Sequence, residues 1–271
     1  MTQVTSQFIG NIPEHYDKGL GPVIFVDCAE EMARRAAATG AMNVLEIAAG
    51  TGIVSRKLRD ALSADAHLIV TDLNSPMLEI AQTKFRAGER IELRQADAMA
   101  LPFASCEFDL VVCQFGVMFF PDKISSFREA ARVLRPGGLY IFNTWGSMAA
   151  NPHSQVSYEV AAKFLTVDPP QYGKVPYSYH DAKAVKVDLQ AAGWSDVQHD
   201  MFTLGKCVAD LPGYADGVVF GTPLIGEIQR RGNIDPKEVV EAIISELQIR
   251  FGPEPITIPL QANVFTCKVT E

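Results

Sequence analysis

The order of apolar and polar positions changes period repeatedly between about residue 43 and residue 145. Short β-rich runs predict five strands, at 43–48, 66–73, 90–98, 108–115 and 139–145. Helical patterns between them predict helices at 53–62, 75–86 and 123–138. We expect Ser75 to cap the second helix and Pro136-Gly137-Gly138 to end the third. Alternation of this kind predicts an α/β fold with a mainly parallel sheet and helices on both faces.

The regular alternation of strand and helix patterns ends after Trp145. Helical patterns recur at 154–165 and 181–194, separated by a Pro- and Tyr-rich stretch at 168–179 that we expect to be a loop. Two further runs, 195–204 and 261–271, predict strands that pair antiparallel, which completes a seven-stranded sheet with an antiparallel last strand. Residues 205–257 lie between them and predict two helices. The segments 146–180 and 205–257 and the first 25 residues are therefore candidates for a cap or lid.

Composition and charge narrow the function. Hydrophobic residues make up 48% of the 271, and the net charge of -8 argues against a nucleic-acid partner. Five cysteines are scattered without a CxxC pair, and five histidines are equally dispersed, so we expect no metal site. The start of the sequence lacks a signal-peptide pattern and no apolar run reaches transmembrane length, so we expect a cytoplasmic protein without membrane insertion.

A glycine loop, "AAGTG" at 48–52, follows the first predicted strand. Gly50 and Gly52 let the backbone approach a ligand, and the next helix offers free N–H groups. Dinucleotide redox enzymes and methyltransferases both use this layout. The NAD fingerprint G-x-G-x-x-G is broken here, because Ser55 stands at its third glycine.

Polar residues terminate four of the predicted strands. Glu46 and Asp72 end the first two, Asp97 follows the third, and Gln114 follows the fourth. Ligands of open α/β sheets bind beyond the carboxyl ends of the strands. We therefore expect these four side chains to converge on one crevice.

With these motifs in place, the chain resembles the class I S-adenosylmethionine-dependent methyltransferases, and is similar to the ubiquinone/menaquinone-biosynthesis type that acts on small molecules. The resemblance covers roughly residues 40 to 145 and is carried by "LEIAAGTG", "TDLNSPML", "QADAMALPF", "FDLVVCQFGVMFF" and "VLRPGGLYIF". It implies a Rossmann-like fold over one domain of residues 1–271, with a cofactor-binding core at 26–145. It also implies S-adenosylmethionine as cofactor.

The resemblance assigns expected roles to single residues. Gly50, Thr51 and Gly52 would lie against the methionine moiety and ribose, with Glu46 bracing the loop and reaching the amino group through water. Asp72 would hold the ribose diol. The remaining expected contacts are Leu73 and Met77 with adenine, Asp97 and Ala98 with the adenine edge, Gln114 and Phe115 with the methionine end, and Tyr16 closing over the cofactor. Ala48 departs from the family, which commonly has glycine there, and we expect a slightly tighter loop.

The expected reaction is methyl transfer to a small organic acceptor by in-line displacement. The sulfonium is already activated, so a base is needed only if the acceptor must lose a proton, and the sequence identifies no catalytic residue. Residues in the cap candidates that could meet the acceptor are His15, His153, Tyr158, Tyr177, Tyr179 and His180. Two alternatives stay open at this point: an NAD-dependent oxidoreductase, and an S-adenosylmethionine-binding protein without catalysis. The acceptor atom and the oligomeric state also stay open.

Overall fold

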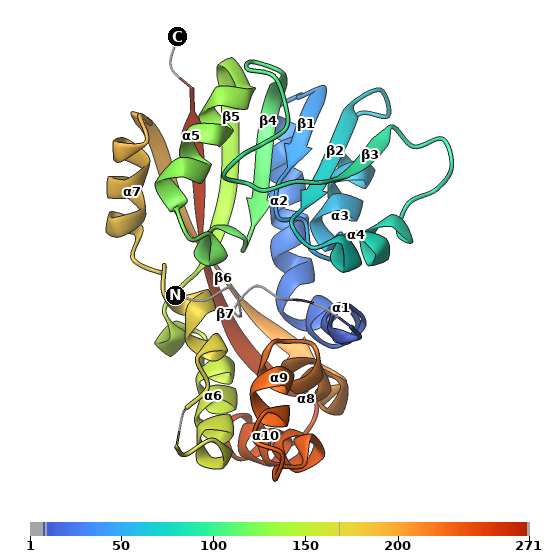
Figure 1. The fold of residues 1–271 in the computed structure, drawn as a ribbon, viewed down its shortest axis with the longest axis vertical. Helices are drawn as coiled ribbons and strands as arrows, with labels where there is room; N and C mark the ends of the chain where they lie inside the picture. Colours follow the sequence, from blue (N-terminus) through green and yellow to red (C-terminus); the bar gives the residue numbers. More distant parts are fainter. Residues whose placement is uncertain (1–7, 9, 168, 270–271) are drawn as a thin grey trace.

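The computed structural model describes residues 8, 10–167 and 169–269. Within these residues one seven-stranded sheet has the order β3-β2-β1-β4-β5-β7-β6 (Figure 1). Its strands are β1 (Asn43–Glu46), β2 (His67–Asp72), β3 (Ile91–Gln95), β4 (Phe108–Gln114), β5 (Leu134–Trp145), β6 (Asp196–Val208) and β7 (Ile256–Lys268). The first five pair in parallel, and β7 is antiparallel to both β5 and β6. The predicted α/β fold with an antiparallel last strand is confirmed.

Helices cover both faces of the sheet because side chains alternate along each strand. Val44 belongs to one apolar cluster with Met32 and Leu58, whereas its neighbour Leu45 belongs to another with Phe127. The first face carries α2 (Val26–Ala38), α3 (Ile53–Ala61) and α4 (Ser75–Gln82), and the second carries α5 (Lys123–Val133) and α7 (Ala182–Ala191). Each buried strand is thus apolar on both sides.

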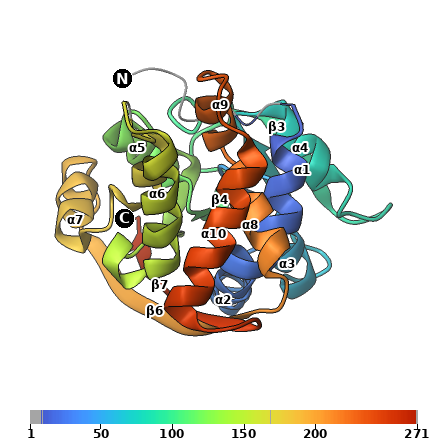
Figure 2. The same ribbon diagram turned by 90° about the horizontal axis from the view of Figure 1, so that it is seen from below.

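Four further helices form a separate lobe, which we call the cap. They are α6 (Pro152–Phe164), α8 (Leu211–Phe220), α9 (Leu224–Gln229) and α10 (Pro236–Phe251). The long strands β6 and β7 extend from the sheet into this lobe, and α10 lies along α6 and α8 (Figures 1 and 2). The apolar cluster of the second sheet face continues into the cap through Val160, Tyr214 and Leu247.

The N-terminal segment lies between the cap and the sheet. It comprises α1 (Ile12–His15) and a stretch of π-helix, η2 (Tyr16–Phe25), which packs on α8. Backbone approaches backbone there: a Cβ on Gly19 would lie 2.6 Å from Gly217 Cα. Short 3₁₀ turns complete the elements: η3 (Val117–Phe119), η4 (Met148–Ala150) and η5 (Tyr172–Tyr177).

Several predicted boundaries are wrong. Asn74, not Ser75, caps α4, and α5 ends at Val133, because Leu134 already pairs with Phe108 at the start of β5. The stretch at 168–179 contains η5 rather than loop alone. The expected insertion at 205–257 holds three helices instead of two. It is also shorter than expected, because the β6–β7 ladder continues as far as Val208 opposite Ile256. Asp168 and the last two residues of the predicted final strand lie outside the described residues.

Within the described part of the chain, no helix is long and apolar enough to cross a membrane.

Candidate functional site

The four predicted polar residues lie at one edge of the sheet. Glu46, Asp72 and Gln114 are the last residues of β1, β2 and β4, and Asp97 follows the end of β3 by two residues. These strands are neighbours and parallel, in the order β3-β2-β1-β4. The carboxyl ends of these strands therefore lie side by side, and they face the N-terminal segment and the cap (Figure 1).

The glycine loop after β1 leaves open space beside its backbone. Gly50 and Gly52 have φ values of +57° and +80°, in the left-handed region that glycine tolerates. A Cβ at Gly52 would lie 2.7 Å from the Ala81 Cβ, whereas one at Gly50 would meet no atom within 4 Å. Gly52 thus brings α3 close to α4, while Gly50 borders free space.

Ala48, the departure from the family pattern, also has a left-handed backbone, with φ +53°. A side chain on Gly116 would come within 2.5 Å of the Ala48 Cβ. Gly116, in the segment after β4, therefore leaves the room that the Ala48 methyl group occupies.

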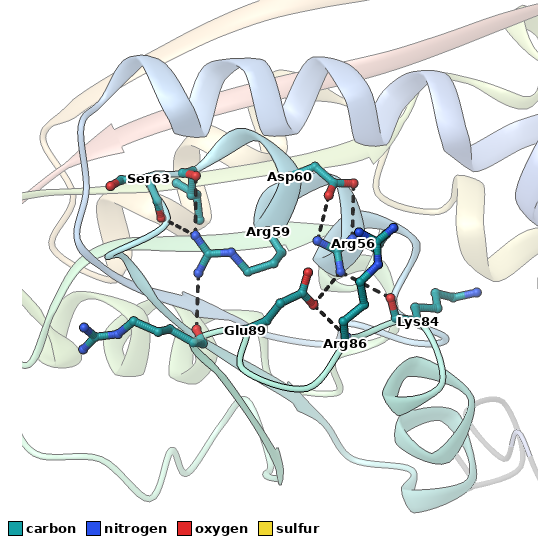
Figure 3. A network of polar contacts seen from close by, with 9 residues as sticks. Arg56, Arg59, Asp60, Ser63, Lys84, Arg86 and Glu89 are labelled. Atoms are coloured by element: carbon teal, nitrogen blue, oxygen red, sulfur yellow. Dashed lines mark hydrogen bonds and ion pairs between the residues drawn. The ribbon is translucent and has the colours of Figure 1, made fainter.

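The far end of α3 is fixed by two arginines (Figure 3). Arg59 is buried and donates to the carbonyl oxygens of Ala66 and Ser63. Arg56 bonds to Asp60 and to Glu89. These contacts set the direction of α3, and hence the place of its N-terminus beside the glycine loop.

Asp72 is held in a fixed orientation by backbone donors. The N–H groups of Gly50 and Asn74 each donate to one of its carboxylate oxygens at 2.8 Å. Burial raises the pKa of Asp72, and these hydrogen bonds oppose the rise. Oδ1 also accepts from the Asn74 side-chain Nδ2 at 3.3 Å, whereas Oδ2 retains a further acceptor position for a ligand hydroxyl group.

The predicted adenine contacts differ in exposure. Leu73, directly after Asp72, is 52% exposed and offers apolar surface. Met77 is 3% exposed and packs with Phe8 and Tyr172. Of the two, Leu73 can be covered by a ligand ring without displacing a neighbour.

On the far side of Asp72, Asp97 is half-buried and accepts from the Met99 N–H at 2.9 Å through one oxygen. Ala98 is buried beside it. The carboxylate of Asp97 keeps a second oxygen that can receive a donor from a ligand.

Glu46 carries a buried and incompletely bonded carboxyl group. It is 1% exposed, and its Oε2 has no hydrogen-bond partner among the described residues; the same holds for Thr51 Oγ1 and Ser55 Oγ. Burial raises the pKa of Glu46 to about 8; the Asp72 charge adds to the rise, and the nearby Ser55 hydroxyl opposes it. A ligand with a cationic amino group would place a positive charge beside the Glu46 carboxylate and donate hydrogen bonds to its unpartnered oxygen. These orphaned atoms, the open space at Gly50 and the Asp72 carboxylate together fit S-adenosylmethionine.

The end of β4 joins the site to the N-terminal segment and to β5. Gln114 Nε2 donates to the Phe25 carbonyl at 3.3 Å. Phe115 has φ +52°, and its N–H donates to Asn143 Oδ1 at 2.8 Å. Sequence reasoning missed Asn143, although an asparagine inside the apolar run "LYIFNTW" is a signal that could have identified it.

An aromatic wall extends from this strand end toward the cap. Phe115 stacks on Trp145 with their ring centroids 3.8 Å apart. The ring centroids of Trp145 and Tyr177 are 6.4 Å apart. Tyr214 on α8 has its ring centroid 6.2 Å from that of His153, and the next residue, Ser154, hydrogen-bonds to the Tyr177 hydroxyl. We call Phe115, Trp145, Tyr177 and Tyr214 the aromatic wall; all four are buried. Trp145 and Tyr214 were not among the predicted site residues.

Tyr16 lies at the start of η2 and stacks on Phe25 at 4.9 Å. Its pKa is raised by burial and, in part, by the charges of Tyr172 and Asp72. Tyr16 also packs against the apolar cluster of Phe8, Met77 and Tyr172, and therefore lies beside one of the predicted adenine contacts.

The six residues that we expected to meet the acceptor lie in different surroundings. His153 and Tyr177 are buried. His15 bonds to Asp216 at 2.7 Å, Tyr179 bonds to Asp188, and His180 is exposed. Tyr158 packs under Lys174. The part of the chain that is described contains no group of three His, Cys, Asp or Glu side chains that could hold a metal ion.

Comparison with known proteins places this site in a family. Residues 44–138 match a family model described as a methyltransferase domain. The demethylmenaquinone methyltransferase of Lactiplantibacillus plantarum is 31% identical over 185 residues, which cover 62% of this chain and 76% of the relative. The chain belongs to the class I S-adenosylmethionine-dependent methyltransferases of the ubiquinone/menaquinone-biosynthesis type.

Other comparisons agree with this methyltransferase assignment. The ubiquinone/menaquinone biosynthesis C-methyltransferase UbiE of Idiomarina loihiensis is 30% identical over 186 residues, covering 64% of this chain and 74% of the relative. The YcgJ structure of Bacillus subtilis superposes with a TM-score of 0.58 at 17% identity, covering 89% of this chain and 99% of its own. Phosphoethanolamine N-methyltransferase 2 of Haemonchus contortus, in complex with S-adenosyl-L-methionine, gives 0.61 at 13% identity, covering 100% and 61%. The structures show the shared fold.

This methyltransferase therefore uses S-adenosylmethionine to methylate a small organic acceptor. The alternatives of an NAD-dependent oxidoreductase and of a non-catalytic binding protein are not supported.

Proposed function

We propose that this methyltransferase transfers the methyl group to a ring carbon of a hydroxylated, quinol-type aromatic acceptor. Two related proteins are named for demethylmenaquinone and for C-methylation in ubiquinone/menaquinone biosynthesis. The observation that carries the proposal is the aromatic wall, which begins at the strand end of Phe115 and continues toward Tyr214 of the cap beside His153 and Ser154. Such a wall packs favourably against a flat ring.

The cofactor site that we propose follows the strand ends. Asp72 accepts both ribose hydroxyls, Glu46 faces the amino group, and Asp97 accepts from the adenine amine beside the Ala98 N–H. The other proposed contacts are Ala48, Gly50, Thr51 and Gly52 in the loop, Leu73 and Met77 near adenine, Gln114 and Phe115 at the methyl end, and Tyr16 as a cover. The geometry of Asp72 and the orphaned Glu46 oxygen support these roles.

S-adenosylmethionine supplies, when bound, a methyl group activated by a positively charged sulfur. The residues of this chain then have two tasks: to align the acceptor carbon in line with that methyl group, and to exclude water. The reduced, dihydroxy form of a quinone ring is rich in electrons and is the nucleophilic form. When its ring carbon gains the methyl group, that carbon loses its hydrogen as a proton, and the donor leaves as S-adenosylhomocysteine. We propose that the aromatic wall performs both tasks for such a ring.

The test is turnover of 2-prenyl-1,4-dihydroxynaphthalene under reducing, anaerobic conditions, with the product analysed by NMR. We expect the new methyl group on a ring carbon. Methylation of a hydroxyl oxygen, or turnover of amines but not of this diol, would contradict the proposed acceptor. Binding of S-adenosylhomocysteine, measured by calorimetry, tests the cofactor site separately.

A further inference from the structure

His153 is a buried histidine whose ring nitrogens are unused. It lies near the start of α6, is 0% exposed, and neither Nδ1 nor Nε2 has a hydrogen-bond partner among the described residues. Other histidines do have partners: His15 bonds to Asp216, His180 to the Tyr177 carbonyl, and His199 to Asn263. An unsatisfied buried imidazole in a native structure calls for a physical explanation.

Its surroundings place it at the cap end of the aromatic wall. The His153 and Tyr214 rings lie 6.2 Å apart. The next residue, Ser154, hydrogen-bonds to the hydroxyl of Tyr177. The imidazole thus lies near the Tyr214 ring, and the residue that follows it is bonded to Tyr177, which leads through Trp145 to Phe115.

We propose that His153 is a positioning residue for the acceptor, and that its imidazole forms a hydrogen bond with a ring hydroxyl of the acceptor between Tyr177 and Tyr214. This inference rests on the proposed function, because it needs a hydroxylated ring held along the aromatic wall. A group that must bond to a substrate hydroxyl discriminates strongly against an analogue that lacks it. His153 would therefore select for free hydroxyls and set the angle of the ring.

The role is positioning rather than proton transfer. Burial lowers the pKa of His153 to about 3, and the Pro259 carbonyl, which lies outside hydrogen-bonding geometry, opposes the shift only in part. The imidazole is therefore neutral at physiological pH, with one donor and one acceptor nitrogen. It can bind a hydroxyl without holding its proton.

The experiment compares the wild-type protein with His153→Leu, His153→Gln and the control His67→Leu. His67 begins β2, at the opposite edge of the sheet from the site. The substrate is 2-prenyl-1,4-dihydroxynaphthalene, and the competitive inhibitor is its 1,4-dimethoxy analogue. We expect His153→Leu to raise KM for the diol at least tenfold with a smaller change in kcat, and to leave the Kd for S-adenosylhomocysteine unchanged.

Selectivity and stability separate this role from a structural one. Wild type should bind the diol better than the dimethoxy analogue, His153→Leu should lose that preference, and His153→Gln should restore part of it. Because Leu removes an unsatisfied buried group, its Tm should equal or exceed that of wild type. A lower Tm with unchanged KM and preference would overturn the inference, and if the Leu variant does not fold, an unchanged preference in His153→Gln would do so.

The same measurements distinguish a wrong acceptor class from a wrong role of His153. If wild type binds S-adenosylhomocysteine but neither binds nor methylates the diol, the acceptor class is wrong and the inference falls with it. If wild type methylates the diol and the His153→Leu variant matches it, only the inference is wrong.

Discussion

Glu46 is a single residue whose protonation links the cofactor site to stability. Burial raises its pKa to about 8, from an ordinary value near 4.5. The folded protein therefore holds this proton more tightly than the unfolded chain, so folding stability is lost as pH rises between these two values. Groups with strongly shifted pKa values cluster in binding and catalytic sites, and Glu46 has such a shift.

We expect Glu46→Gln to be more stable than wild type at neutral and alkaline pH in the absence of cofactor. The difference should grow between pH 5 and pH 8 with a limiting slope of about 1.4 kcal/mol per pH unit, and then level off. Urea unfolding at a series of pH values measures it, and the raised pKa of Asp72 largely cancels because both proteins carry it. A difference independent of pH would contradict the shifted pKa.

Two glycines of the same loop should respond differently to alanine. Gly52→Ala places a methyl group 2.7 Å from the Ala81 Cβ at a left-handed φ, so we expect a loss of about 2–4 kcal/mol in the free energy of unfolding. Gly50→Ala meets no neighbour and should cost about 1 kcal/mol, from its backbone alone. Its methyl group would instead occupy ligand space and weaken S-adenosylhomocysteine binding at least tenfold by calorimetry. Equal stability losses would contradict this division.

At the scale of elements, the contact between η2 and α8 depends on backbone-to-backbone approach. A Cβ on Gly217 would lie 2.8 Å from Gly19 Cα. Because main chain cannot move aside as a flexible side chain can, the two elements would have to separate. A hydrogen bond between His15 of α1 and Asp216 of α8 also links the N-terminal segment to this helix.

We expect Gly217→Ala to lower the free energy of unfolding by about 1–3 kcal/mol. The matched control is Gly226→Ala in α9, where a Cβ meets no atom within 4 Å and the helix gains about 0.5–1 kcal/mol from alanine. Thermal and urea unfolding of the two variants should therefore shift in opposite directions. A stabilised Gly217→Ala protein would show that the close contact is not maintained.

For the whole molecule, the N-terminal segment connects the cofactor edge with the cap. Lys84, just after α4, pairs with Asp17 of η2 at 2.6 Å, and Gln114 bonds to Phe25 at the other end of η2. The segment is thus tied to the sheet by side chains and to α8 by its backbone. A ligand at the strand ends would be covered by an element that also contacts α8 of the cap.

S-adenosylhomocysteine should therefore slow hydrogen exchange in η2 and α8 together, while α7 exchanges as before. The ligand should also stabilise the protein by about 2.7 kcal/mol at 100 times its Kd. Asp17→Asn should reduce the protection of η2, because one of its ties to the sheet is weakened. Protection confined to the glycine loop, with η2 unaffected, would show that the segment does not cover the ligand.

The local sequence accounts for most of the α/β core. Each of the first five strands combines a short apolar run with a turn signal, so their existence, their sequence along the chain and their parallel pairing could be predicted. Parallel pairing then brings Glu46, Asp72, Asp97 and Gln114 to one edge, because side chains at the carboxyl ends of adjacent strands must be neighbours. Local pattern thus predicted that these four side chains meet at one edge of the sheet, and their contacts with the cofactor stay a prediction.

Tertiary contacts decided the rest. The end of β6 has a weak alternation of its own and becomes a strand because β7 pairs with it residue by residue as far as Val208. The aromatic wall joins Phe115, Trp145 and Tyr214 from three distant segments, and no local periodicity can specify such a contact. Burial without a partner, as at His153, is likewise a property of packing, since it depends on which elements surround the side chain rather than on its neighbours in sequence.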